Sequence, residues 1–407
     1  MFIDYNGTIP ELRKQHNIMI FIGNGFDISV LSKYRKDKLI SSYSKFYDYL
    51  CYKGFNEENV LFNKMTEDKR DCKENWSDFE NSLGELIEEG VLPANLKKAL
   101  REIQEEFLYF LNELVTPEVL LEVNRDSEEN KWASTALSNF LGDLCEEDYK
   151  KINFSKGLYH YDMYNYLFVN FNYTSLFDSY IFLDKEQFDP EMYDTVDRNF
   201  KFYADPKNYL NKKLKMNHKD SYSSYLMTST IHPHGYQSIP RSLIFGVEKD
   251  KYTSREDKEK RKFNKSYWVQ NDRKYKRSID NTELFIIFGA SAGETDSWWW
   301  RNIRESLLKE NSKSELIIYH YNDDINCDKD KVKENFIEAC RVENEETEET
   351  SKKLKEKIYV ISYNDNKKIN MFGFKDWDVE KRDKDKKQAK AKAKRQAEAK
   401  KRTKGKK

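Results

Sequence analysis

Short apolar runs recur along the chain, and their length and composition are typical of buried β-strands. They are rich in β-branched and aromatic residues, and their hydrophobicity is continuous rather than alternating. The runs occupy residues 17–22, 166–170, 226–231, 242–245, 284–288, 316–319 and 358–361. Continuous runs of this kind predict strands of a parallel sheet that is covered on both faces.

A long helical region separates the first predicted strand from the second. Between residues 96 and 114, apolar side chains recur at i+3 and i+4 spacing, which predicts an amphipathic helix. Residues 41–49 and 76–89 also read as helices. Residues from about 40 to 160 are therefore expected to form a large helical insertion, because a crossover of this length exceeds a single connecting helix.

The later part of the chain alternates strands with helices. Helices are predicted at 298–308 and at 332–340, each directly between two predicted strands. This alternation predicts an α/β fold, a Rossmann-like parallel sheet with helices on both faces, within one domain of residues 1–380.

Composition excludes several classes of protein. The chain has 407 residues, 38% hydrophobic and 35% charged, and no run approaches the roughly 18 apolar residues that cross a bilayer. No basic segment followed by an apolar one begins the chain, so we expect no signal peptide and no membrane partner. The five cysteines are widely spaced and form no CxxC pair, which predicts a reducing, cytoplasmic location and no thiolate metal site.

The net charge of zero hides a strong asymmetry. Residues 381–407 carry 15 Lys and Arg against 3 Asp and Glu, so this segment has a net charge of +12 and the rest of the chain −12. We expect a disordered, basic, low-complexity tail. Attachment to nucleic acid or another polyanion is the alternative to a merely solvated extension.

The first strand is followed by Gly23, Asn24, Gly25, Phe26 and Asp27. Glycines between a strand and a helix let the backbone approach a phosphate, and the helix N-terminus offers free N–H groups. A plain tight turn explains the same residues. The carboxylate of Asp27 is expected either to cap the helix or to contact a ribose hydroxyl.

The second strand ends at a segment that contains Asn172 and Thr174. An Asn side chain has donors and an acceptor, so Asn172 is able to hold a ribose hydroxyl or orient a water molecule. An Asx turn at the strand end is the structural alternative.

Two histidines, His232 and His234, precede Gly235 at the end of a third predicted strand. Their spacing suggests a metal site, but no acidic third ligand is evident, so no metal is expected. A general base at His234 fits the position better, with His232 as a structural histidine.

The strand at 284–288 also ends in small residues. Gly289 keeps the loop open, and the Ser291 hydroxyl is able to bind a phosphate or a ribose. Asp296 is expected to begin the following helix.

These motifs together resemble the bacterial abortive-infection AbiH family. The resemblance rests on GNGFD, the WSDFENSLGEL segment at 76–86, FNYT, HxHG followed by IFG at 244–246, and FGxSxGxxD. It spans roughly residues 18–321. Family members typically read GHSLG where this chain has Gly-Ala-Ser-Ala-Gly at 289–293, so the contacts of that loop differ.

The same order of motifs is more distantly similar to sirtuins and sirtuin-like NAD-hydrolysing defence proteins. That resemblance implies NAD as the substrate, His234 as catalytic base and Asn172 beside the nicotinamide ribose. It implies a cofactor-binding set of Gly23, Asn24, Gly25, Phe26, Asp27, Thr174, Gly289 and Ser291, with the last two on the adenosine side. Thr174 stands where the related motif usually has Asp. The cysteines cannot form the four-cysteine zinc module of sirtuin deacetylases, which disfavours deacetylation.

The leading hypothesis is therefore an anti-phage effector that hydrolyses NAD⁺ at the nicotinamide N-glycosidic bond. It implies a phage-derived trigger as partner and leaves homo-oligomerisation open. A non-catalytic sensor of a nucleotide or ADP-ribose is the alternative, and Thr174 supports it. A nucleic-acid-directed effector, based on the tail, is a third.

Overall fold

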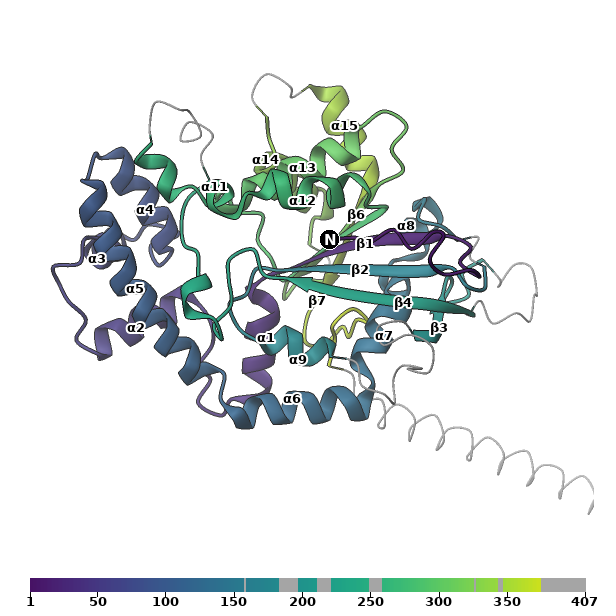
Figure 1. The fold of residues 1–407 in the computed structure, drawn as a ribbon, viewed down its shortest axis with the longest axis horizontal. Helices are drawn as coiled ribbons and strands as arrows, with labels where there is room; N and C mark the ends of the chain where they lie inside the picture. Colours follow the sequence, from purple (N-terminus) through teal and green to yellow (C-terminus); the bar gives the residue numbers. More distant parts are fainter. Residues whose placement is uncertain are drawn as a thin grey trace, which may run out of the picture.

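A twisted β-sheet forms the centre of the molecule (Figure 1). The computed structural model describes residues 1–156, 159–182, 197–210, 221–248, 258–325, 327–342 and 347–374. Within these residues the sheet has seven strands in the order β3-β4-β2-β1-β5-β6-β7. The strands are β1 (Gln15–Ile22), β2 (Met163–Asn170), β3 (Asp197–Tyr203), β4 (Ser221–Ile231), β5 (Leu284–Phe288), β6 (Glu315–Tyr321) and β7 (Ile358–Tyr363).

Every neighbouring pair in the sheet is parallel except β3 with β4. From β1 the chain builds outward to β2 and β4, and later to β5, β6 and β7 on the other side. This is the strand order of a doubly wound Rossmann-like sheet, so the α/β prediction is confirmed. The direction of winding reverses between β1 and β5, and the crevice at the carboxyl ends of these strands is where such folds hold ligands.

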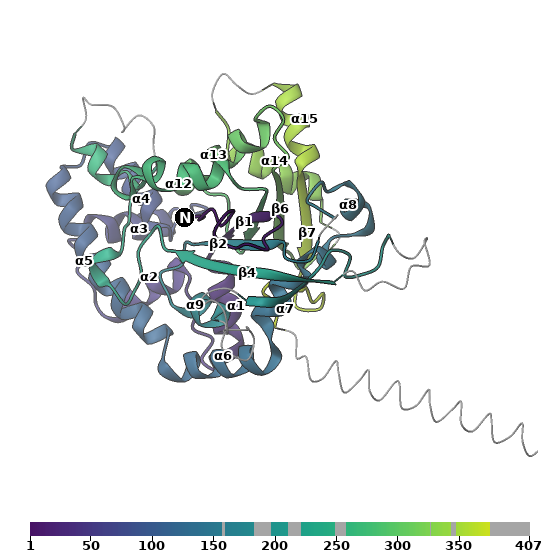
Figure 2. The ribbon, with the colours of Figure 1, turned by 45° about the vertical axis from the view of Figure 1, so that its right-hand side comes forward.

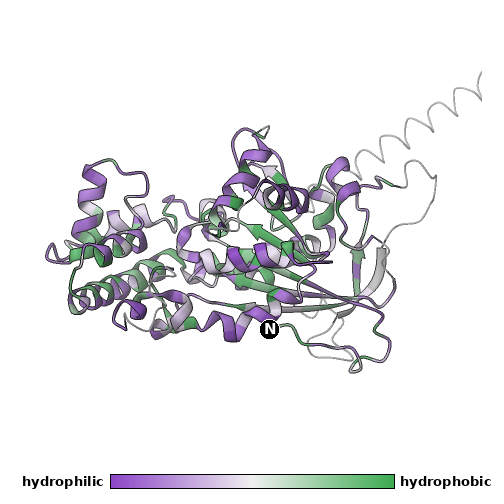
Figure 3. Cartoon of the chain, turned by 90° about the horizontal axis from the view of Figure 1, so that it is seen from above, coloured by the Kyte–Doolittle hydropathy of each residue, from purple (hydrophilic) through white to green (hydrophobic). Residues whose placement is uncertain are grey.

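Helices cover both faces of the sheet (Figures 1 and 2). One face carries α1 (Asn24–Tyr34), α6 (Pro117–Asn130), α7 (Trp132–Asn139) and α9 (Leu176–Ile181). The other carries α12 (Asn271–Asp280), α13 (Ser297–Leu308), α14 (Lys329–Ala339) and α15 (Glu348–Lys357). Every residue of β2, β5 and β7 is buried, as their continuous apolar sequences require. Figure 3 shows the same layering as hydrophobic strands between helices with hydrophilic outer sides.

The predicted helical insertion is present and has two parts. Its first helices stand together beyond the carboxyl ends of the strands, whereas α6 and α7 return to cover the sheet (Figure 1). The other helices of the insertion are α2 (Tyr43–Tyr52), α3 (Val60–Arg70), α4 (Phe79–Glu88), α5 (Pro93–Leu114) and α8 (Glu146–Lys151), and the short helix α11 (Lys265–Val269) lies later in the chain. The apolar stripe of α5 is buried at Leu96, Ile103, Phe107 and Phe110, which confirms that helix from its spacing. The first part of the insertion is thereby held against the ligand-binding edge of the sheet.

The strand predicted at 242–245 is wrong. The chain there forms a short 3-10 turn, Pro240–Ser242, and then runs back along the histidine loop, where the Ile244 N–H donates to the His234 carbonyl at 2.8 Å. The short apolar run is buried against the insertion instead of joining the sheet. Edge strand β3 and helix α15 have no counterpart in the prediction. The basic tail at 381–407 lies outside the described residues.

Two further predictions concern cysteines and membranes. None of the five cysteines, all of them among the described residues, forms a disulfide, and three of them are exposed. Among the described residues, no helix combines the length and apolarity that crossing a bilayer demands.

Candidate functional site

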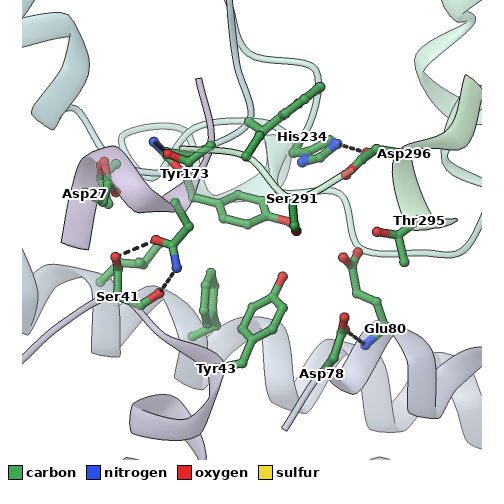
Figure 4. Close-up of a pocket in the computed structure, with 18 residues that line it drawn as sticks. Asp27, Ser41, Tyr43, Asp78, Glu80, Tyr173, His234, Ser291, Thr295 and Asp296 are labelled. Atoms are coloured by element: carbon green, nitrogen blue, oxygen red, sulfur yellow. Dashed lines mark hydrogen bonds and ion pairs between the residues drawn. The ribbon is translucent and has the colours of Figure 1, made fainter. Parts of the chain in front are cut away.

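A cavity of about 190 Å³ lies at the carboxyl ends of the central strands, and we call it the strand-end cavity. Each of the four sequence motifs contributes to its wall, through Gly23, Asn172, His234 and Ser291 (Figure 4). Helices of the insertion complete it, with Tyr43, Asp78, Glu80, Phe107 and Leu111. Residues that are up to 273 positions apart in the chain, Gly23 and Asp296, are therefore brought together at the predicted edge of the sheet.

The glycine turn after β1 is interlocked with the loop after β5. The N–H of Gly23 donates to the Phe288 carbonyl at 2.9 Å, and that of Gly25 donates to the Gly289 carbonyl at 2.8 Å. A Cβ atom on Gly23 would lie 2.4 Å from Cα of Ala290, which no side chain tolerates. Glycine is thus required at position 23 because two loops are in contact there. This agrees with the structural explanation of the motif, a tight turn, without any need for a bound phosphate. The Gly25 amide is occupied by a protein carbonyl, and a phosphate contact by this turn stays a prediction.

Asp27 joins the first motif to the second. The Thr174 hydroxyl donates to Oδ2 of Asp27 at 2.6 Å, while Oδ1 is buried without a hydrogen-bond partner. Burial raises the pKa of Asp27 to about 7, against the opposing effect of the Thr174 hydrogen bond. The N-cap of α1 is Gly23, so the capping role considered for Asp27 is wrong. Its carboxyl instead lines the strand-end cavity and changes protonation near neutral pH.

Asn172 is buried beside the glycine turn. Its Nδ2 donates to the Gly23 carbonyl at 3.1 Å, which fixes the orientation of the amide. The Asx-type turn at the strand end is made by the neighbouring Asn170, whose Oδ1 accepts the Asn172 N–H at 3.0 Å. The Oδ1 atom of Asn172 therefore remains as a hydrogen-bond acceptor on the cavity wall.

Two other residues of the predicted cofactor-binding set face protein partners. Asn24 donates from Nδ2 to the Ser41 carbonyl at 2.7 Å and accepts from the Ser41 hydroxyl at 2.5 Å. Phe26 is fully buried and packs edge-on against Phe177 and Tyr180. Asn24 lines the strand-end cavity, whereas Phe26 belongs to the apolar core beneath it.

His234 forms a pair with Asp296. Its Nε2 lies 2.8 Å from Oδ1 of Asp296, and its ring stacks on Phe171 at 5.0 Å between centroids. A carboxylate at Nε2 favours the tautomer that carries its proton there, which leaves the lone pair on Nδ1. No hydrogen bond from the described residues reaches Nδ1. Asp296 is the N-cap residue of α13, so its predicted place at the start of that helix is confirmed, although its side chain makes no capping bond there and pairs with His234 instead.

A buried chain of charges continues from this pair into the insertion. Nζ of Lys265 lies 3.8 Å from Asp296 and 2.9 Å from Glu80, and the other Glu80 oxygen accepts the Gly246 N–H at 2.9 Å. Burial opposes ionisation of Asp296, but Lys265 and His234 outweigh it and hold the pKa of Asp296 below its ordinary value. Burial likewise opposes the charge of Lys265, whose pKa Asp296 and Glu80 nevertheless raise. The histidine is thus oriented by an ionised carboxylate.

Asp78 and Tyr43 lie across the strand-end cavity from His234, whereas Tyr173 lies beside the histidine with ring centroids 6.0 Å apart (Figure 4). Asp78 caps α4, and burial together with the charge of Glu80 raises the pKa of Asp78 to about 6. Burial also raises the pKa values of Tyr43 and Tyr173 well above the ordinary range, so both keep their hydroxyl protons. Sequence reasoning assigned none of these residues. The sequence signal that could have identified Asp78 is the 76–86 segment, which is one of the motifs of the family resemblance but was given no function.

The second histidine lies outside the strand-end cavity. Nε2 of His232 contacts Asp178 at 3.1 Å, a different carboxylate from that of His234. Within the described ranges, no three His, Cys, Asp or Glu side chains gather in a way that could hold a metal ion.

Two larger cavities adjoin the strand-end cavity. One of about 720 Å³ shares Asp78, Glu80, Ser291, Thr295 and Asp296 with it. The other, of about 670 Å³, shares Ala290 and Ser291. Gly25 and Gly289 line this last cavity rather than the strand-end cavity, so the predicted site residues do not all line one space.

Comparison with known proteins agrees with the motif-based resemblance. A protein-family model described as Bacteriophage abortive infection AbiH matches residues 19–319. That span includes the insertion and all four strand-end motifs. No curated protein matches the chain. The more distant resemblance to sirtuin-like NAD-hydrolysing proteins stays a prediction.

Proposed function

This chain belongs to the bacteriophage abortive-infection AbiH family, and we propose that it acts in abortive infection by hydrolysing NAD⁺ at the nicotinamide N-glycosidic bond. One observation carries the proposal. Gly23, Asn172 and the His234–Asp296 pair, which follow four separate strands, line one cavity at the point where the sheet reverses its winding. A histidine base, a neutral amide and a narrow walled space are the parts that this reaction needs.

His234 is the general base of the proposed reaction. Asp296 holds the proton of Nε2 and stabilises the imidazolium that forms when Nδ1 accepts a second proton. Phe171 fixes the plane of the ring by stacking. Lys265 holds the pKa of Asp296 below its ordinary value, so this carboxylate is ionised at neutral pH.

Asn172 positions the nucleophile and the ribose. Its Nδ2 is held by the Gly23 carbonyl, so Oδ1 is a fixed acceptor for a ribose hydroxyl or a water molecule. The water oxygen bonds to C1′ of the ribose as the bond from C1′ to the pyridine nitrogen breaks. That electron pair leaves with neutral nicotinamide, and the proton of the water passes to Nδ1 of His234. The products are ADP-ribose, nicotinamide and one proton.

The size of the strand-end cavity limits which part of the substrate it takes. Its volume of about 190 Å³ is below the roughly 300–1,000 Å³ of ordinary ligand pockets, so a whole dinucleotide must extend into an adjoining cavity. Nicotinamide and its ribose are the parts that belong beside His234. The insertion supplies the outer wall through Tyr43 and Phe107, which keeps bulk water from the reacting bond.

The Asp27–Thr174 contact bears on the sensor alternative. Thr174 takes the place of an Asp in the sirtuin-like motif, and this substitution was the main support for a protein that binds a nucleotide without cleaving it. A carboxyl nevertheless reaches the same spot from the other strand end, because Asp27 lies 2.6 Å from the Thr174 hydroxyl. Thr174 in place of Asp is therefore weaker support for a non-catalytic sensor than it was from the sequence alone.

Nicotinamide release tests the proposal. Purified protein is incubated with NAD⁺, with and without lysate from phage-infected cells, and nicotinamide is quantified by chromatography. We expect release that His234→Ala abolishes and that His232→Ala, the matched change at the histidine outside the cavity, leaves within about threefold. No release from either incubation, or equal release by His234→Ala, would overturn the proposal. NAD⁺ that binds and is recovered intact would support the sensor.

A further inference from the structure

The three cavities meet at Ser291, and the two larger ones have opposite charge. We call the cavity of about 720 Å³ the acidic cavity: the described residues that line it include nine carboxylates and one lysine, Lys73. Lys73 is itself paired with Asp68 and Glu85. Carboxylates therefore remain in large excess, and a cavity lined by one sign of charge concentrates its field.

The cavity of about 670 Å³, which we call the basic cavity, lies at the carboxyl ends of β5, β6 and β7. Its described lining holds three lysines, Lys33, Lys367 and Lys368, against the single carboxylate of Asp365. Its volume is that of an ordinary ligand pocket. A negatively charged group entering the site beside Ser291 is thus attracted to this side and repelled from the other.

The field around Lys367 has the sign that an anion requires. Burial lowers the pKa of Lys367, and the positive charges of Lys329 and Lys207 lower it further. Its Nζ donates to the Ser362 carbonyl at 2.6 Å rather than to a carboxylate. A bound phosphate would relieve this repulsion, since lysine is a common phosphate ligand.

Lys33 approaches the same cavity from α1, the helix that follows the glycine turn. Its Nζ lies 4.4 Å from the ring centroid of Trp132 and 3.9 Å from Oδ2 of Asp126. Aromatic rings are also present, because Tyr321 and Tyr363 line the cavity with centroids 5.5 Å apart. Cations beside aromatic faces suit a ligand that carries both phosphates and a planar ring.

We propose that the basic cavity binds the phosphate-bearing half of the ligand through Lys33, Lys367 and Lys368, while its other half lies at the acidic side of Ser291. The identification of the ligand as a dinucleotide rests on the proposed function. The orientation follows from charge alone. Oxidised NAD⁺ has a cationic pyridinium ring at one end and an anionic diphosphate in the middle, and the site offers carboxylates and lysines in the matching order.

This arrangement also selects the oxidation state. In NADH the nicotinamide ring is neutral, so NADH keeps the attraction of its phosphates to the lysines but loses that of its ring to Asp78, Glu80 and Asp296. The oxidised dinucleotide is therefore the preferred ligand.

Binding of ADP-ribose by calorimetry tests the basic cavity, because this probe contains the phosphates and has no bond to hydrolyse. We expect Lys368→Gln and the double variant Lys367→Gln/Lys368→Gln to raise its Kd, the double variant by about tenfold or more. Lys73→Gln makes the same chemical change in the acidic cavity and is expected to leave the Kd within about twofold. Both lysines are exposed, and the single variant Lys368→Gln keeps the Lys367–Ser362 hydrogen bond. The single variant therefore still tests the basic cavity if the double variant does not fold.

Equal Kd values for wild type and both variants, an equal loss in Lys73→Gln, or no ADP-ribose binding by the wild type would overturn the inference. The orientation of the dinucleotide is checked with carba-NAD⁺, which is not hydrolysed. Carba-NAD⁺ should bind with a lower Kd than NADH, and Asp78→Asn should reduce the ratio between these two Kd values. A preference for NADH would contradict it. If nicotinamide release did not change in the lysine variants, the proposed function would hold and this inference would fail. If ADP-ribose binding depended on the lysines but no nicotinamide were released, this inference would hold and the proposed function would fail.

Discussion

Nε2 of His234 lies 2.8 Å from Oδ1 of Asp296, although 62 residues separate the two in the chain. The histidine follows β4 and the aspartate precedes α13, so strands on opposite sides of β1 must be in place before the pair exists. Lys265 and Glu80 then connect the pair to helix α4 of the insertion. The proposed base therefore depends on the sheet and on the insertion together.

Asp296→Asn is expected to lower nicotinamide release by roughly 10²–10⁴-fold, because an amide at Nε2 no longer stabilises the imidazolium and favours the wrong tautomer. Initial rates at saturating NAD⁺ measure the effect. Asp178→Asn, which changes the carboxylate paired with His232, is the matched control and should keep near wild-type rates. Wild-type rates for Asp296→Asn would contradict a role for the pair.

Asp27 should make folding stability depend on pH. Its pKa in the folded state is raised from 3.8 to about 7, so the folded protein holds this proton more tightly than the unfolded chain. The stabilisation is complete below about pH 4 and is lost as the pH rises through 7, a change on the order of 4 kcal/mol at most. Asp27→Asn removes this titration. In urea unfolding at pH 5, 6, 7 and 8, the free energy of unfolding of the variant should therefore rise relative to that of the wild type as the pH increases. Parallel profiles would contradict the assignment.

Gly23→Ala should destabilise the protein by about 2–4 kcal/mol, because the new Cβ would meet backbone of the loop after β5 at 2.4 Å. Gly293→Ala is the control in that same loop: its nearest contact would be 3.9 Å away, and a change within about 0.5 kcal/mol is expected. Thermal or urea unfolding measures both. If the two variants proved equally stable, the interlocked loops would not be the reason for glycine at position 23.

Lys265→Met should cost about 3–5 kcal/mol of unfolding free energy, since it leaves the buried carboxylates Glu80 and Asp296 without their cation. Adding Glu80→Gln removes one of these charges and should restore part of the loss. The free energies of unfolding of the wild type, both single variants and the double variant form a double-mutant cycle. Additive losses would show that the two residues do not interact.

Local pattern was sufficient to predict most of the fold. The strands could be recognised because buried parallel strands are apolar at every position, and α5 because its buried residues recur at helical spacing. The error at 242–245 has the same origin, since a short apolar segment packed against a loop looks like a strand. Edge strand β3 was missed because its sequence, DRNFKFY, mixes polar with apolar residues and forms no continuous apolar run.

The site was predictable where it follows strands and not elsewhere. His234 and Asn172 come directly after β4 and β2, and parallel strands bring their carboxyl ends together. Asp78, Glu80 and Lys265 enter the site from the insertion and a short helix, through contacts that no local pattern encodes. The place of Asp296 at the start of α13 was predicted correctly, but its pairing with the distant His234 was missed because no local pattern links the two residues.

Cellular NAD⁺ during infection tests the central claim most directly. NAD⁺ and nicotinamide are measured by mass spectrometry in infected bacteria that express either the wild-type protein or His234→Ala at equal levels. We predict that NAD⁺ falls and nicotinamide rises in step with it only in the wild-type cells, before the phage is released. Unchanged NAD⁺ in cells where the wild-type protein aborts the infection would contradict the account.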